Sequence, residues 1–174
     1  MVGALAGEEE AGYYRVSSRL AAFIPFFLMA TNNVMAPRFS AIYSEGKTEN
    51  LQKILTYVAR GTMFVTFPLF VVVLLWPKEI INLFFGSEYV IAYISFIILV
   101  IANFFSVLMG QVGQVMALTG HEKITAVAVF FSVIINIILN LILVPDYGMN
   151  GAAIATALSI VIWNGILAYW TVRK

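Results

Sequence analysis

The chain has 174 residues, of which 61% are hydrophobic and 11% charged, and its formal net charge is +1. A soluble domain is normally about a quarter charged, and disorder needs low hydrophobicity with high charge, so the composition excludes both. The small net charge provides no basic field for nucleic acid. The absence of cysteine excludes disulfides, thiolate zinc sites and cysteine nucleophiles.

Five long stretches carry no charged residue, and they are residues 20–37, 61–77, 89–120, 124–145 and 147–172. A bilayer core about 30 Å thick is crossed by roughly 20 apolar residues of helix. We therefore predict an all-α fold, a polytopic transmembrane helical bundle with about five membrane helices.

The N-terminal part is predicted to hold one short segment and one long helix. Residues 1–10 are expected to be the tail of a preceding membrane helix and an outward-facing acidic loop. The first helix of the five-helix transmembrane region (11–174) is expected at 11–43, about 50 Å long at 1.5 Å per residue. Because it exceeds the hydrocarbon thickness, it must tilt, bend or project. Pro25 predicts a kink mid-span, and Pro37 marks the far end.

The second helix is predicted at 48–76 and is amphipathic up to Arg60. Trp76 is expected at headgroup depth, and Pro68 is a further kink candidate. Residues 78–85 read as a short apolar-rich turn near the membrane surface.

The last three helices are predicted at 89–118, 123–144 and 150–172. The fourth is expected to stop at Pro145, with a turn at 145–148. His121 falls in the break before that helix and is expected to be a solvated loop residue. A single histidine makes no metal site, and we predict no metal or cofactor.

Small and polar residues recur on two of these helices at spacings of three and four. One stripe holds Asn103, Ser106, Gly110, Gly113 and Ala117, and the other holds Gly151, Ala155 and Ser159. Small residues let helix backbones approach closely within a membrane. Both stripes therefore predict close helix packing.

Six amides within the spans are candidate residues of a polar cavity: Asn32, Asn33, Asn103, Gln114, Asn136 and Asn140. Polar groups within a span usually face other helices or water. Two adjacent amides at 32 and 33 suggest a water-accessible segment. The pair at 136 and 140 either bonds across helices or lines a wet cavity, and both readings stay open.

Three arginines lie within or near the spans, and they are the candidate anion-binding residues. Arg15 and Arg19 are one turn apart on one helix face, and Arg60 lies about 18 Å along the second helix. Such cations either snorkel to phosphate headgroups or grip a phosphate within a cavity. Every acidic residue lies at an edge or in a loop. No catalytic or nucleotide-binding motif is present, which predicts a protein that is not an enzyme.

Three segments resemble a known family. They are Gly12–Val16 with the following Arg19 and Leu20, Pro37–Ser40, and the run Val144–Thr156. Their order and spacing resemble the oligosaccharide flippase branch of the multidrug/oligosaccharidyl-lipid/polysaccharide exporter superfamily. The resemblance covers essentially the whole chain.

The resemblance implies a MATE-like, two-lobed bundle of twelve or more helices around a central cavity, of which this chain would be the last five. Such proteins flip undecaprenyl-pyrophosphate-linked oligosaccharides across the bacterial inner membrane by alternating access. It implies as partners the lipid-linked substrate, membrane lipids, the missing N-terminal lobe, and a polysaccharide polymerase with glycosyltransferases. Arg15 and Arg19 fall on the matching motif and would hold the pyrophosphate, with Arg60 a further candidate.

Orientation follows from lysine and arginine, which favour cytoplasmic loops. Six lie on the side of the C-terminus and three on the other, so the C-terminus is predicted to be cytoplasmic. Three alternatives remain: a cation-coupled multidrug exporter of the same superfamily, a membrane-embedded glycan-processing enzyme, and a structural membrane subunit. The first would need embedded carboxylates, and the second would need a catalytic acid or base at a large loop.

Overall fold

The computed structural model of the chain describes residues 1–46, 48–110, 113, 116, 120 and 122–172. Its described elements are helices, with no strand among them, which confirms the all-α prediction. They are α1 (Val2–Leu5), α2 (Glu8–Ala21), α3 (Phe23–Ser44), α4 (Thr48–Leu75), α5 (Pro77–Phe85), the 3-10 helix η1 (Ser87–Ala92), α6 (Tyr93–Met109) and α8 (Glu122–Val172).

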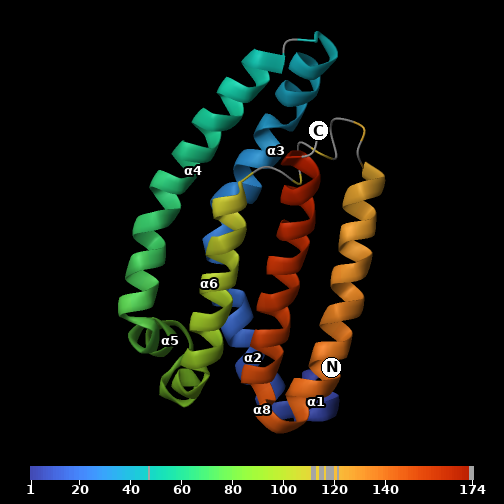
Figure 1. Cartoon of the computed structure of the whole chain (residues 1–174). Coiled ribbons are helices and arrows are strands. Elements are labelled where there is room, and N and C mark those ends of the chain that lie inside the picture. The colour runs from blue at the N-terminus through green and yellow to red at the C-terminus, as the bar shows by residue number, and fades with distance from the viewer. Residues whose placement is uncertain (47, 111–112, 114–115, 117–119, 121, 173–174) are drawn as a thin grey trace.

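Three segments of the described chain are long and apolar enough to cross a membrane: 49–75, 87–109 and 122–171. The bent pair α2–α3 counts as a fourth if it forms one span. Because α8 contains a break at Gly148, it consists of two helices that run as antiparallel arms (Figure 1). The structure is therefore that of a helical membrane bundle.

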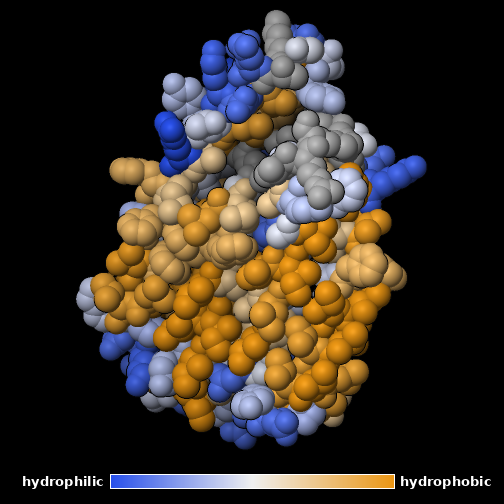
Figure 2. Space-filling model, viewed as in Figure 1, coloured by the Kyte–Doolittle hydropathy of each residue, from blue (hydrophilic) through white to orange (hydrophobic). Residues whose placement is uncertain are grey.

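The helix α6 lies at the centre of the bundle and packs against α2, α3, α4 and α8. In the segment 87–109, which comprises η1 and α6, 44% of the most apolar 18-residue stretch is buried, against 17% in 49–75 and 22% in 122–171. Phe96, Leu99 and Val100 of α6 form a core cluster with Ile24 of α3 and Ile81 of α5. Outside this core, Figure 2 shows a broad hydrophobic surface between two hydrophilic ends, as expected for a protein surrounded by lipid.

The helices α2 and α3 meet at an angle of 49°. The bend lies at Ala22, within the turn that Pro25 disrupts, because proline has no N–H to donate to the carbonyl of Ala21 four residues earlier. The Nδ2 atom of Asn103 on α6 donates to this carbonyl at 3.4 Å. The amide of Asn103 thus satisfies the backbone group that Pro25 leaves unpaired.

This arrangement predicts an energetic coupling between Asn103 and Pro25. Asn103→Leu is expected to lower the free energy of unfolding by about 1 kcal/mol, because the Ala21 carbonyl loses its partner. In a Pro25→Ala background the alanine N–H can reach this carbonyl within the helix, so the same substitution should cost clearly less. A double-mutant cycle of unfolding in detergent, followed by circular dichroism, measures the coupling. Equal costs in the two backgrounds would contradict it.

Two prolines expected at or near helix ends lie inside helices. Pro37 lies within α3, which ends at Ser44, one residue beyond the predicted bound of 43. Pro145 does not stop the fourth helix, since the chain stays helical until Gly148, with φ +53° and ψ −132°. Proline removes a single hydrogen bond from a helix, whereas a positive φ interrupts it, and glycine adopts a positive φ readily.

Glycine also sets two further boundaries that differ from the prediction. Over 89–109 the predicted helix 89–118 consists of the end of η1 and of α6, which ends at Met109 because Gly110 has φ +68°; of the rest, residues 113 and 116 are described and helical. Residues 78–85, predicted as a turn, belong to α5, which begins with Pro77 at its first position and is followed by Gly86 with φ +99°. Proline is favoured in the first turn of a helix.

The acids near the N-terminus lie in a helix and not in the predicted loop. Glu8, Glu9 and Glu10 form the first turn of α2, where negative charge complements the helix dipole. The Oε2 atom of Glu10 accepts a hydrogen bond from the backbone N–H of Met149 at 2.7 Å. Glu10 therefore caps the second arm of α8 and ties it to α2.

Candidate functional site

The two arginines of α2 point away from the bundle core. Arg15 and Arg19 are exposed, whereas Val16, Ser17 and Leu20 on the opposite face are buried. Within the described residues, neither guanidinium group makes a hydrogen bond or an ion pair, although the backbone carbonyl of Arg15 accepts one from Ser18 Oγ. Both guanidinium groups are thus available to a ligand or to another part of the protein.

The face of these arginines continues along the bent helix pair. Exposed residues follow at intervals of four and seven, and we call Arg15, Arg19, Phe26, Asn33 and Pro37 the α2–α3 stripe. Polar and charged groups in a span are costly against bare lipid. The stripe therefore suits a surface that faces water or the rest of a larger protein.

Asn32, next to the stripe, is partly buried. Its Oδ1 atom is buried without a hydrogen-bond partner in the described part of the chain. Buried polar atoms normally have a partner. Asn32 and Asn33 thus bring an unsatisfied acceptor and an exposed amide to the middle of α3.

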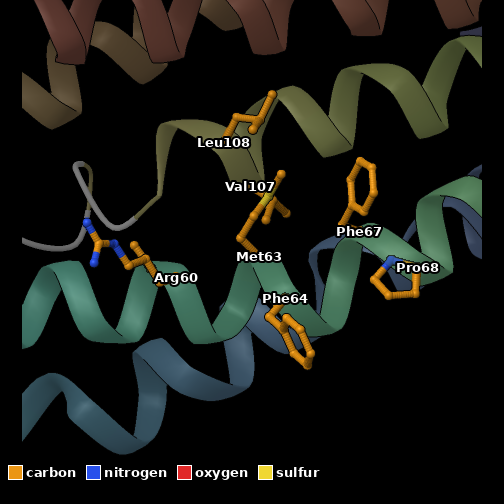
Figure 3. Close-up of a pocket in the computed structure, with 8 residues that line it drawn as sticks. Arg60, Met63, Phe64, Phe67, Pro68, Val107 and Leu108 are labelled. Carbon is orange, nitrogen blue, oxygen red and sulfur yellow. The ribbon is translucent and has the colours of Figure 1, made fainter.

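The structure does not bring the third arginine, Arg60, into a groove with Arg15 and Arg19. Arg60 is exposed on α4 and lines two grooves, neither of which contains a residue of α2. Figure 3 shows its side chain at the end of α6, beside the row of apolar residues between α4 and α6. Its role is therefore argued separately below.

The other candidate amides occupy different places. Asn103 bonds to the Ala21 carbonyl, and the buried Asn140 donates through Nδ2 to O and Oδ1 of Asn136 at 2.8 and 3.1 Å. These two bonds lie within one helix. Asn136 also lines a groove of about 320 Å³ between the arms of α8. Gln114, and likewise His121, lies outside the described residues.

Several polar contacts between helices were not predicted from the sequence. The hydroxyls of Tyr14 and Thr156 are 2.8 Å apart, and Ser17 Oγ donates to the Ala92 carbonyl at 3.0 Å. Ser95 Oγ donates to Asn150 Oδ1 at 2.7 Å. These bonds join α2, α8 and the η1–α6 segment. The only signal in the sequence is the presence of hydroxyl and amide groups among apolar neighbours.

The small-residue stripes behave differently along the chain. Gly151, Ala155 and Ser159 are all buried, and Ser132 Oγ donates to the Ser159 carbonyl across the arms of α8 at 3.0 Å. On α6, Ser106 Oγ accepts from Nδ2 of Asn164 at 3.3 Å. Ala117 lies outside the described residues. Gly110, in contrast, ends α6 with φ +68°. The stripe of Gly151, Ala155 and Ser159 therefore serves helix packing throughout, whereas the stripe that begins at Asn103 does so only in part.

The fold and these surfaces define a class of protein, a multi-pass α-helical membrane protein with a cationic, polar face on a bent helix. The described residues hold no group of three or more potential metal ligands. The profile of the family described as polysaccharide biosynthesis protein matches residues 1–94, and the chain belongs to this family. The family resemblance indicated by the sequence motifs is thereby confirmed.

The chain is also similar to curated proteins. It is 28% identical over 170 residues to the probable low-salt glycan biosynthesis flippase Agl15 of Haloferax volcanii, covering 98% of this chain and 36% of the relative. Two uncharacterized membrane proteins of Methanocaldococcus jannaschii, MJ1068 and MJ1375, are 24% and 28% identical over 165 and 166 residues. Those matches cover 94% of this chain and 32% and 38% of the relatives.

The chain thus spans about a third of the length of the curated relatives that it matches. No solved structure matches the chain.

Proposed function

We propose that this chain is part of a transporter that moves a lipid-linked oligosaccharide across the cytoplasmic membrane by alternating access, for polysaccharide biosynthesis. The observation that carries the proposal is the α2–α3 stripe, where Arg15 and Arg19 lie exposed on a bent membrane helix. The polysaccharide biosynthesis family and the flippase-named relative support it.

The chemistry of the stripe suits a phosphate-linked glycan. A guanidinium group can bind phosphate oxygens through two parallel hydrogen bonds, and one helical turn between Arg15 and Arg19 lets both approach one diphosphate. Asn32 and Asn33 can exchange hydrogen bonds with sugar hydroxyls. The arginines act as electrostatic holders of an undecaprenyl-pyrophosphate or similar carrier, and no bond is made or broken.

The remaining two-thirds of the relatives' length supplies the other side of the cavity in this proposal. A stripe that faces another lobe across water avoids the cost of placing cations against lipid. The excess of lysine and arginine on one side supports a cytoplasmic C-terminus, in the bacterial inner membrane. Glycosyltransferases would supply the substrate there, and a polymerase would use it on the far side.

Deletion of the gene tests the proposal in the organism that carries it. Surface polysaccharide should be lost, and its lipid-linked precursor should accumulate in the cytoplasmic leaflet, because synthesis continues while transfer stops. Extraction and mass spectrometry measure the precursor, and a membrane-impermeant glycosidase reports the leaflet. Reintroduction of the intact gene is the control. Normal surface polysaccharide without precursor accumulation would overturn the proposal.

A further inference from the structure

Two grooves of opposite character meet at Arg60. One, of about 520 Å³, lies between α4 and α6 and is lined by Met63, Phe64, Phe67, Pro68, Val107 and Leu108, with Arg60 at one end (Figure 3). The other, of about 480 Å³, lies along the first turns of α4 and is lined by Glu49, Gln52, Lys53, Thr56 and Tyr57, again with Arg60. Both volumes are in the range of ligand sites.

Arg60 stands at the boundary between water and hydrocarbon on α4. It is the last charged residue before the uncharged stretch 61–77. From Arg60 to Pro68 the helix rises by about 12 Å, and one leaflet of the hydrocarbon core is about 15 Å thick. Phe64 is 81% exposed and Leu108 is 52% exposed. The apolar groove therefore opens toward lipid over most of one leaflet.

The charges of the polar groove favour an anion. Lys53 and Arg60 are two turns apart on α4 and face one acid, Glu49, so the cations exceed the acids by one. Within the described residues, neither cation forms an ion pair or a hydrogen bond. An anionic head group can therefore bind at Arg60 without displacing a partner, and the guanidinium offers paired donors to a phosphate.

We propose that these grooves form a binding site for an anionic phospholipid, with its phosphate at Arg60, its head group toward Lys53 and one acyl chain along the apolar groove. A phospholipid matches the order of surfaces, since a charged head precedes an apolar chain along the same axis. The site contains no residue of α2, where the oligosaccharide diphosphate is proposed to bind. The inference is thus independent of the proposed function.

Quenching by brominated lipid tests the site. Phe67→Trp places a fluorophore in the apolar groove, and Trp76, Trp163 and Trp170 are replaced by phenylalanine. The chain is reconstituted in vesicles of phosphatidylcholine in which either brominated phosphatidylglycerol or brominated phosphatidylcholine is introduced. Brominated phosphatidylglycerol should bind about fivefold more tightly than brominated phosphatidylcholine, as expected for one cation that contributes about 1 kcal/mol.

Two matched substitutions test whether the preference for phosphatidylglycerol depends on Arg60. Arg60→Gln is expected to abolish the fivefold preference for phosphatidylglycerol. Arg38→Gln removes another exposed arginine, on α3 and outside both grooves, and should leave the preference unchanged. Equal quenching by both lipids in the reporter chain, or a preference that survives Arg60→Gln, would overturn the proposal.

Two further measurements complete the test. Native mass spectrometry of the chain with its own tryptophans should retain more phosphatidylglycerol than the Arg60→Gln variant does, which avoids any effect of the reporter on folding. In the quenching assay, unbrominated phosphatidylglycerol should displace its brominated form better than a polyprenyl phosphate does. The reverse order would assign the groove to the lipid-linked substrate and overturn the phospholipid assignment.

Discussion

Replacing Gly151 by alanine is expected to disrupt the turn at Gly148 that joins the two helical arms of α8. A Cβ atom at this position would collide with the carbonyl oxygen of Leu143 and would lie 2.6 Å from its carbonyl carbon and 3.1 Å from the nitrogen of Val144. These are backbone atoms, which cannot rotate away as a side chain can. The clash can be relieved only if the two arms separate. Such a separation would expose Ala152 and Ala153, which follow in the chain and are almost fully buried.

We expect Gly151→Ala to lower the free energy of unfolding by about 3 kcal/mol, the upper part of the usual range for overpacking. Against a typical total of about 5–15 kcal/mol, this loss should sharply reduce the yield of folded chain. Thermal unfolding in detergent, followed by circular dichroism, measures the effect.

Gly165 provides the matched control for this substitution. It lies in the same arm of α8, it is exposed, and a Cβ atom there would meet nothing within 4 Å. Gly165→Ala should therefore be neutral or stabilise the helix by up to about 1 kcal/mol, because alanine favours helical backbone over glycine. If both alanine variants unfold at the same temperature, the close approach of the α8 arms is not what stabilises the turn.

The helices could be predicted from sequence because their signal is local. Uncharged stretches of 17 residues or more must satisfy their backbone hydrogen bonds internally in lipid, which a helix does. The ends were less predictable, since Pro37 and Pro145 lie inside helices while Gly110 and Gly148 interrupt them. A proline removes one hydrogen bond and leaves the helical backbone possible, whereas a glycine with a positive φ interrupts it.

The candidate site shows the same division. The spacing of Arg15 and Arg19 predicts that they share a helix face. The direction of this face, away from the core, is known only from the packing of α2 on α6 in the structure. The contacts of Glu10 with Met149 and of Asn103 with Ala21 join residues 139 and 82 positions apart. No periodic pattern encodes such pairs, because each depends on one side chain reaching one backbone group.

Replacing both Arg15 and Arg19 by alanine in the complete transporter is expected to abolish surface polysaccharide while protein levels stay normal. Both side chains are exposed, and neither guanidinium group makes a hydrogen bond or an ion pair within the described residues. Folding should therefore be little affected. Loss of two charge-assisted interactions, each worth about 1.5 kcal/mol or more, should weaken binding of a diphosphate about 100-fold or more.

Three comparisons separate this role from simple anchoring at the membrane surface. Lysine at both positions keeps the charge but loses the bidentate geometry, so we expect partial transport. Arg38→Ala removes an exposed arginine of α3 outside the stripe and should leave polysaccharide unchanged. Arginines that only contact headgroups would act on insertion, so their loss would lower protein levels in the membrane. Unchanged surface polysaccharide in the double alanine variant would remove Arg15 and Arg19 from the substrate site.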